Sequence, residues 1–328
     1  MKKLLLLSSI LFTMGLCSQN IKGVSKDAFA HTYSIVARDT ITGEMAVAVQ
    51  SHWFSVGSIV SWGKAGVGVV ATQSFVNPAY GPEGLELMSE GIPADEALTR
   101  LVEKDDGRAY RQIAFLDANG NVSGFTGSKC VEAAEDLQGK NFSVQANMML
   151  NDKVVPAMAE AFVRYSDYPL AERVVEALKA AQEAGGDIRG KQSAALVVVG
   201  PEKTDKAWEE KKIDLRVDDH KTPIKELERL LKVHRAYEHM NKGDLAVEDG
   251  DMEKALKEYA AAEKMFPDNL EMKYWKAVAL ANSGRLEEAK PIFKKVFAED
   301  ENWKEMTTRL PASGILTISE EELQEIIE

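Results

Sequence analysis

GGDIRGKQSAA, residues 185–195, connects an amphipathic helix to the apolar run Leu196–Val199. The glycines allow the backbone to turn tightly or to approach a neighbouring segment closely. Asp187, Arg189 and Ser193 place polar groups beside a strand that its apolar sequence predicts to be buried. Two interpretations stay open for this segment: a helix C-cap and turn that hold a buried Asp–Arg pair, or one wall of a functional site.

The hydrophobic pattern upstream of this segment alternates between groups of strands and pairs of helices. Runs of β-branched or alternating residues predict strands, and apolar stripes at three- and four-residue spacing predict helices. Asn119-Gly120 is a strong hairpin signal. This order favours an α+β domain with sheets faced by layers of helices. Strands are expected over 33–37, 45–49, 57–62, 67–72, 112–116, 122–126, 142–149 and 192–199, and helices from near residues 81, 94, 154 and 170.

The composition argues against several classes of function. The chain has 328 residues and a formal net charge of −12, so nucleic acid and anionic membrane surfaces are not expected partners. Its five histidines are scattered, and no HExxH or CxxC pair occurs, so no metal site is expected. The sequence has no Gly-rich phosphate loop after a strand, so we expect no nucleotide cofactor.

Residues 1–18 form a secretory signal pattern outside the fold. A basic start precedes the apolar run Leu4–Leu16, which is shorter than the roughly 20 residues that span a bilayer. Cys17 offers a lipid attachment site, but the leucine before it is larger than the small residue usual there. We therefore predict a secreted or periplasmic protein with residues 19–31 as a spacer, and lipid anchoring at Cys17 as the weaker alternative.

Many short motifs follow one another between residues 32 and 200. They include Tyr33–Asp39, Val47–Ser51, Ala71–Gln73, Asn77–Gly81, Phe125–Gly127, Gln145–Asn147, Ala171–Arg173 and the segment 185–195. Together they resemble the bacterial family catalogued as domain of unknown function 1028. The resemblance implies the fold of the N-terminal-nucleophile hydrolases, a four-layer αββα sandwich with two antiparallel sheets between helices. We expect this domain to cover residues 32–215.

The resemblance makes Thr32 the candidate nucleophile. In such hydrolases the first residue of the mature domain attacks an amide carbonyl, and its α-amine, with a reference pKa of about 7.7–8.0, accepts the proton. Thr32 follows His31 here, so the role requires cleavage of the His31–Thr32 bond. We expect Thr32 at the lip of a cleft, with residues 185–193 as the opposing rim. The alternative is a strand threonine whose hydroxyl is hydrogen-bonded within the fold.

Further polar residues at strand ends would line the same cleft. Asn77 and Asn147 are the candidate catalytic partners, because an amide group can donate to a developing oxyanion or orient the nucleophile. Arg111 has a planar fork suited to a carboxylate, and a salt bridge is its alternative role. Turn chemistry before a proline is the alternative for Asn77, and a buried strand start is that for Ser193. The expected substrate-binding residues are Gln50, Ser51, Gln73, Arg111, Asp187, Arg189 and Ser193.

A sequence repeat follows the predicted sheet domain. Gly250, Ala255, Tyr259 and Ala262 recur as Gly284, Ala289, Phe293 and Val296, at the offset of a tetratricopeptide repeat. Each unit is a helix hairpin that needs neighbours to bury its apolar face, so helices at 224–239 and 320–327 are expected to cap the pair. We expect a helical domain over residues 216–328 that binds protein or peptide, or serves as a structural annex or dimer surface. A homo-oligomer is the expected assembly.

Two functions from different classes remain open. The first is a secreted amidohydrolase or peptidase of the N-terminal-nucleophile type, acting without a cofactor on a peptide, a small amide or a cell-wall fragment. The second is a non-catalytic exported module that works through its helical repeats. The first residue of the mature chain separates them, because only a chain that begins at Thr32 has the required amine.

Overall fold

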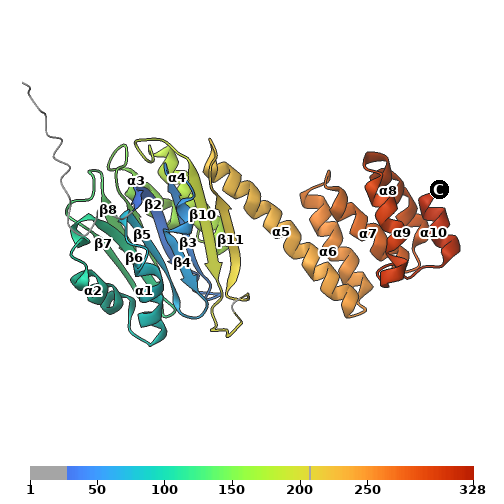
Figure 1. Ribbon diagram of the computed structural model, residues 1–328, viewed down its shortest axis with the longest axis horizontal. Helices are drawn as coiled ribbons and strands as arrows, with labels where there is room; N and C mark the ends of the chain where they lie inside the picture. The colour runs from blue at the N-terminus through green and yellow to red at the C-terminus, as the bar shows by residue number, and fades with distance from the viewer. Residues whose placement is uncertain (1–27, 207) are drawn as a thin grey trace, which may run out of the picture.

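The computed structural model describes residues 28–206 and 208–328, and Figure 1 shows a sandwich of sheets and helices joined to a helical tail. The predicted signal peptide, Cys17 and most of the predicted spacer lie outside the described residues. No helix within the two described ranges is long and apolar enough to cross a membrane.

Two antiparallel sheets form the centre of the N-terminal body. The strand order is β1-β5-β6-β7 in the first sheet, where β4 also pairs with β5, and β11-β10-β3-β2-β9-β8 in the second. The first sheet contains β1 (Ala28–Ala30), β4 (Ser61–Lys64), β5 (Gly68–Val76), β6 (Arg111–Asp117) and β7 (Val122–Thr126). The second contains β2 (Thr32–Arg38), β3 (Met45–Ser51), β8 (Glu135–Gly139), β9 (Phe142–Ala146), β10 (Ser193–Val199) and β11 (Lys211–Val217).

The two sheets pack face to face through an apolar layer. Side chains alternate between the two faces of a strand, so every second residue of β2, β3 and β10 meets every second residue of β5 and β6. Val36, Val47 and Val197 of the second sheet belong to one buried cluster with Val69 and Leu116 of the first. This layer sets the distance between the two sheets and how they lie over one another.

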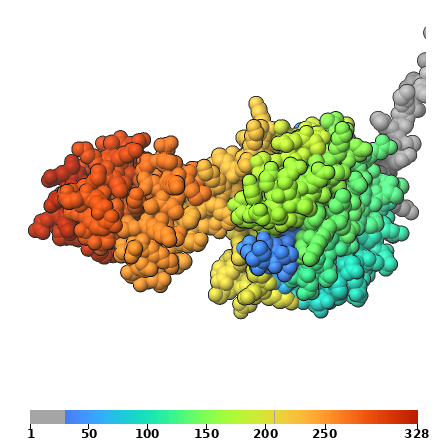
Figure 2. All heavy atoms as spheres, turned by 180° about the vertical axis from the view of Figure 1, so that it is seen from behind, coloured from blue at the N-terminus to red at the C-terminus, as the bar shows by residue number. Residues whose placement is uncertain are grey.

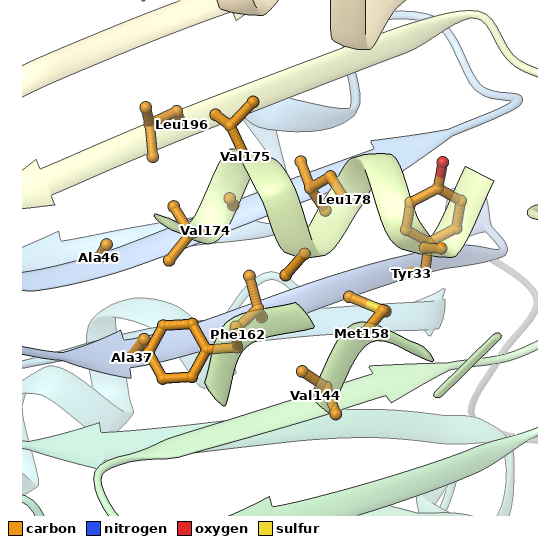
Figure 3. Close-up of a cluster of buried hydrophobic side chains, with 14 of the residues drawn as sticks. Tyr33, Ala37, Ala46, Val144, Met158, Phe162, Val174, Val175, Leu178 and Leu196 are labelled. Carbon is orange, nitrogen blue, oxygen red and sulfur yellow. The ribbon is translucent and has the colours of Figure 1, made fainter. Parts of the chain in front are cut away.

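Helices cover both outer faces, which gives four layers in the order helix, sheet, sheet, helix. They are α1 (Tyr80–Ser89), α2 (Ala94–Lys104), α3 (Val154–Arg164) and α4 (Leu170–Glu183). α1 and α2 pack on the first sheet, and α3 and α4 on the second. Figure 3 shows Met158 and Phe162 of α3 and Val174 and Leu178 of α4 gathered over β2. In Figure 2 the green and lime-green segments, which include these two helices, lie over the upper part of the body, with blue, teal and yellow segments beside them.

A long helix, α5, leaves the sheet body and enters the tail. It was expected over 224–239 but runs without a break from Pro223 to Glu248, and it packs on β10, β11 and α4 at its start. The repeat is visible in the packing, because Tyr259 and Phe293 are both buried at equivalent places. The tail consists of α5 (Pro223–Glu248), α6 (Met252–Met265), α7 (Leu270–Asn282), α8 (Leu286–Glu299), α9 (Asn302–Arg309) and α10 (Glu320–Ile327).

The α+β class, the antiparallel sheets and the all-helical tail are confirmed. The strand predicted over residues 57–62 is wrong in its first part, because residues 57–58 belong to the short 3-10 helix η1 (Val56–Ser58) and the strand β4 begins only at Ser61. Gly57 explains the difference. A Cβ there would come within 2.4 Å of the Ala195 side chain, so only a glycine lets the backbone fold this closely against β10. The edge strand β8 was not predicted, because its mostly polar sequence lacks a clear apolar alternation.

Candidate functional site

At one end of the sandwich the layer between the sheets changes from apolar to polar. On β2 the face that carries Val36 continues through position 34 to Thr32. In the strand register Thr32 lies opposite Ser51 of β3, and Ser51 lies opposite Ser193 of β10. On the other side of β2 the Asn147 backbone N–H donates to the Thr32 carbonyl (3.1 Å). Neighbouring segments therefore place hydroxyl and amide groups in one row, the polar row: Ser193, Ser51, Thr32 and Asn147.

Behind the polar row, buried side chains of both sheets form a hydrogen-bonded network. Gln73 of β5 donates to Gln112 Oε1 of β6 (2.8 Å) and accepts from Ser34 Oγ (2.6 Å). Asn147 Nδ2 donates to the same Gln112 Oε1 (2.8 Å), and Gln145 Nε2 donates to Ser34 Oγ (2.6 Å). An unpaired buried polar group costs about 1–3 kcal/mol, so this pairing fixes the side chains that surround Thr32.

The carbonyl group of His31 accepts two strong hydrogen bonds. Ser51 Oγ donates to it at 2.6 Å, and Arg189 Nη2 donates at 2.7 Å. This carbonyl is the acyl half of the His31–Thr32 peptide bond. One donor belongs to a guanidinium, and hydrogen bonds from an ionised donor are about twice as strong as neutral ones. The arrangement polarises the one peptide bond whose cleavage would expose Thr32.

Asp187 holds Arg189 in position. Its carboxylate accepts from Arg189 Nη2 (2.7 Å) and Nε (3.0 Å), and also from the backbone N–H groups of Arg189 (2.9 Å) and His52 (3.1 Å). The Asp187 side chain is fully buried, whereas 24% of the Arg189 side chain is exposed. The first interpretation of the segment 185–195 is confirmed, because it holds a buried Asp–Arg pair, and this pair also lies against His31 at the start of β2.

The His31 side chain packs in a specific polar and aromatic setting. His31 Nδ1 donates to Asn147 Oδ1 (2.5 Å), since an amide oxygen only accepts. The ring meets Phe75 edge to face with 5.9 Å between centroids, and Phe75 in turn meets Tyr110 at 5.5 Å. Burial lowers the pKa of His31 below its ordinary value, and the bond to Asn147 opposes that shift. The imidazole is therefore held neutral near pH 7.

Thr32 is buried and does not lie at the lip of an open cleft in the described chain. It has 0% exposure, its hydroxyl donates to the Ala30 carbonyl (2.8 Å), and its nitrogen is bonded to His31. The reason is that residues 28–30, expected as spacer, form β1 and pair with β5 through Ala30 and Ser74. In this form Thr32 has no amine to act as a base, and its hydroxyl matches the alternative of a hydrogen-bonded strand threonine.

Arg111 and Asn77 do not join the site. Arg111 is 2% exposed and forms a buried ion pair with Asp105 (2.8 Å), on the face of β6 toward α1 and α2. Burial raises the pKa of Asp105, but hydrogen bonds from Arg111 and from the Gly107 N–H outweigh burial and lower it. Asn77 Oδ1 accepts the Ala79 N–H (3.1 Å) in the turn that starts α1. Arg111 thus has a structural role in place of the predicted contact with a substrate, and Asn77 has one in place of its predicted catalytic role.

Two other predicted substrate-binding residues differ in their positions: Ser193 ends the polar row, and Gln50 faces away from it. Ser193 Oγ donates to the Trp53 carbonyl and accepts the Val56 N–H (3.1 Å), so it secures the loop after β3. Gln50 points to the opposite face of the second sheet, beside Tyr33. Its amide is buried and has no hydrogen-bond partner among residues 28–206 and 208–328. Neither side chain contacts the His31 carbonyl.

Several residues of the site were missed from the sequence. Ser34, Gln112 and Gln145 are buried polar residues, and His31 was noted only as the residue before Thr32. Ser34 and Gln145 lie two residues from Thr32 and Asn147, so a strand period of two would have placed them on the same face. No group of three or more His, Cys, Asp or Glu side chains in the described ranges could hold a metal ion.

Comparisons with known proteins identify a family for the sheet body and a repeat in the helical tail. Residues 32–227 match the family described as "Family of unknown function (DUF1028)", and residues 240–300 match a tetratricopeptide repeat. A crystal structure of a DUF1028 protein from Silicibacter pomeroyi is similar, with 33% identity and a TM-score of 0.56, over 62% of this chain and 88% of that one. The comparison with curated proteins gave no match. Since the family match covers more than half of the sequence, the chain belongs to the family of unknown function DUF1028.

Proposed function

We propose that this chain is the exported precursor of an amide hydrolase of the N-terminal-nucleophile type. Thr32 is the nucleophile, and cleavage of the His31–Thr32 bond activates it. The observation that carries the proposal is the pair of donors, Ser51 Oγ and Arg189 Nη2, at 2.6 and 2.7 Å from the His31 carbonyl oxygen. Donors aimed at an oxygen where negative charge develops are the largest single contribution to many acyl transfers.

The activating step is an acyl shift followed by hydrolysis. Thr32 Oγ attacks the carbonyl carbon of His31, and Ser51 and Arg189 stabilise the oxyanion that forms. When the C–N bond breaks, the Thr32 nitrogen leaves as an amine and takes the proton that the hydroxyl lost. An ester between residue 31 and Thr32 Oγ remains, and water hydrolyses it to a carboxylate and the Thr32 hydroxyl.

The mature site uses the same donors on a substrate. The Thr32 amine, with a reference pKa of about 7.7–8.0, accepts the hydroxyl proton near neutral pH. A substrate carbonyl attacked by Thr32 Oγ occupies the place that the His31 carbonyl leaves, so Ser51 and Arg189 serve as its oxyanion donors. Asn147 and Gln73 bind the Thr32 carbonyl instead, at 3.1 Å through the Asn147 backbone N–H and 3.3 Å through Gln73 Nε2, and keep the nucleophile in place.

The decisive experiment measures the first residue and the intact mass of the purified full chain during incubation at pH 7.5. We expect a product that begins at Thr32, no such product from Thr32→Ala, and a slower one from Thr32→Ser. Ser58→Ala is the matched control, because Ser58 Oγ only donates to the exposed Ser55 carbonyl. A wild-type chain that keeps residue 31 and hydrolyses no amide in a panel of peptides would refute the proposal.

A second candidate function is protein binding through the helical tail, without catalysis. Tetratricopeptide repeats generally mediate contacts between proteins, and an open groove of about 580 Å³ lies between α6, α7 and α8, lined by Leu256, Leu280 and Ile292 among others. The buried hydroxyl of Thr32 favours this function as long as the chain stays uncleaved. Processing at residue 32 decides between the two candidates.

A further inference from the structure

The segment that covers Thr32 has the geometry of a bound substrate, and from it we infer the substrate class. We infer that the mature enzyme cleaves peptides after a histidine that follows a small residue, with the acyl side of the peptide bound as a strand along β5. This inference rests on the proposed function. It deepens that function because it names which amide the site selects.

The backbone of the covering segment completes one edge of the first sheet. β4 pairs with residues 68–71 of β5, and β1 pairs with residues 74–76 on the same side. Departure of the segment therefore leaves the 74–76 edge without a strand. An extended peptide that adds to such an edge gains main-chain hydrogen bonds for affinity, and pockets for its side chains supply specificity.

The position before the histidine selects a small side chain. Ala30 is fully buried within the apolar layer between the sheets, in the same cluster as Val76 and Ala71. Protein interiors are packed closely enough that one extra methylene is felt. A substrate with a large residue at this position would have to displace the walls of that layer.

The histidine position selects a flat ring that can donate a hydrogen bond. The His31 ring donates to Asn147 Oδ1 (2.5 Å) and rests against the edge of Phe75. Asn147 is itself fixed, because its Nδ2 donates to Gln112 Oε1 (2.8 Å). A leucine in the same place leaves the Asn147 oxygen without this donor, and a site built around a hydrogen bond discriminates strongly against a group that lacks it.

The reaction on such a peptide is a hydrolysis. Thr32 Oγ attacks the carbonyl carbon of the substrate histidine, the C–N bond breaks, and the amine leaves with the proton that the Thr32 amine relays. Water then cleaves the ester, which yields a peptide ending in a histidine carboxylate and restores the Thr32 hydroxyl. The chain beyond the cleaved bond corresponds to β2 of the precursor, so the covering segment templates only the acyl side.

The test uses processed protein obtained from the full chain and acetyl-Ala-Phe-Ala-His 4-nitroanilide, compared with peptides that carry Leu for His, or Phe for the second Ala. We expect kcat/KM at least about tenfold higher for the first peptide than for either substitute. The peptide acetyl-Ala-Phe-Ala-His with a free carboxylate should inhibit competitively. In Asn147→Leu the preference for His over Leu should fall toward one, and Asn147→Asp, which keeps an acceptor oxygen but loses the bond to Gln112, should retain part of it.

The outcomes separate this inference from the proposed function. Equal kcat/KM for the His and Leu peptides overturns the inference and leaves the hydrolase proposal standing. Selective binding of the Ala-His peptide without hydrolysis of any amide supports the inferred specificity and refutes the hydrolase. Failure of both binding and hydrolysis in protein that begins at Thr32 refutes both.

Discussion

Two buried Asp–Arg pairs, Asp105–Arg111 and Asp187–Arg189, use the same geometry at two places in the sheet body. In each, the arginine binds the carboxylate and also donates to a backbone carbonyl at 2.7 Å, that of Phe75 for Arg111 and that of His31 for Arg189. Each aspartate also accepts backbone N–H groups. The pairs differ in the peptide bond that they polarise, because only the His31 carbonyl is followed by a hydroxyl residue at the polar row. The ion pair alone therefore does not identify an active site.

The largest expected effect is a loss of unfolding free energy at Arg111 that leaves the processing rate unchanged. Arg111→Met leaves the Asp105 carboxylate buried and without its partner, which should cost about 3–5 kcal/mol of unfolding free energy. The rate of processing in the folded fraction should not change, because Arg111 lies on the opposite face of its sheet from Thr32. Urea denaturation of an unprocessed Thr32→Ala background measures the first effect, and intact-mass kinetics in the Thr32 chain measure the second. Normal stability with blocked processing would reverse the roles of the two pairs.

The matching change at Arg189 also leaves a buried aspartate, Asp187, without its partner, but unlike the change at Arg111 it should slow processing in the folded fraction. Arg189→Met removes one of the two donors to the His31 carbonyl and should slow processing by about 10²–10³-fold, the usual effect of losing one oxyanion donor. Arg189→Lys keeps the charge but loses the two-pronged contact with Asp187, so an intermediate rate is expected. Processing of Arg189→Met at the wild-type rate would contradict the assigned role of the guanidinium.

The sequence predicted the residue types of the site better than their directions. Ser51 and Asn147 were selected because they stand at strand ends and Thr32 through the family resemblance, and the register brings the three together. Arg111 was selected for its planar fork, yet it immediately precedes Gln112 in β6 and so faces the opposite side. Alternation in a single strand shows that two faces exist, but the partner sheet decides which face is internal.

The strand β1 could not be predicted from the sequence. Three residues are too few for a periodic pattern, and their pairing depends on the edge of β5, more than forty residues away along the chain. The helical tail is the opposite case, because the repeat offset identified equivalent positions, such as Tyr259 and Phe293, which the structure shows to be buried. Local periodicity is predictable, whereas the occupancy of a sheet edge is a tertiary property.

A pH experiment on the unprocessed chain should separate the contribution of His31, which lies beside the Asp187–Arg189 pair, from that of the Asp105–Arg111 pair. Burial lowers the pKa of His31, so the unfolded chain binds more protons than the folded chain just below the unfolded histidine pKa of about 6.5. The stabilisation that comes from the neutral His31 is then fully present above that pH, and it is lost as the pH falls toward the pKa of His31 in the folded chain. The lowered pKa of Asp105 acts in the same direction, but only below the ordinary aspartate pKa of 3.8. In the Thr32→Ala background, urea denaturation between pH 7.5 and 5 should show this loss, and His31→Asn should reduce it.

An equal pH slope in the His31 variant would mean that another group near the polar row titrates. The Asp105–Arg111 pair cannot supply that slope between pH 7.5 and 5, because its carboxyl pKa is held below 3.8. The His31 variant therefore tests the environment of His31 without disturbing the Asp105–Arg111 pair.

The smallest effect is expected at a third arginine pair, Arg235–Glu172, which joins α5 to α4. Its distance of 2.9 Å equals that of a strong ion pair, but the two side chains are 28% and 30% exposed. Solvent screens such a pair, so a double-mutant cycle of Arg235→Ala and Glu172→Ala should give a coupling of about 0.2–1 kcal/mol. Processing should be unaffected, because neither residue contacts the segment 28–32. A coupling as large as the loss expected for Arg111→Met would show that the geometry of an ion pair outweighs its burial in setting its strength. Burial would then no longer be a reason for treating Arg111 as structural.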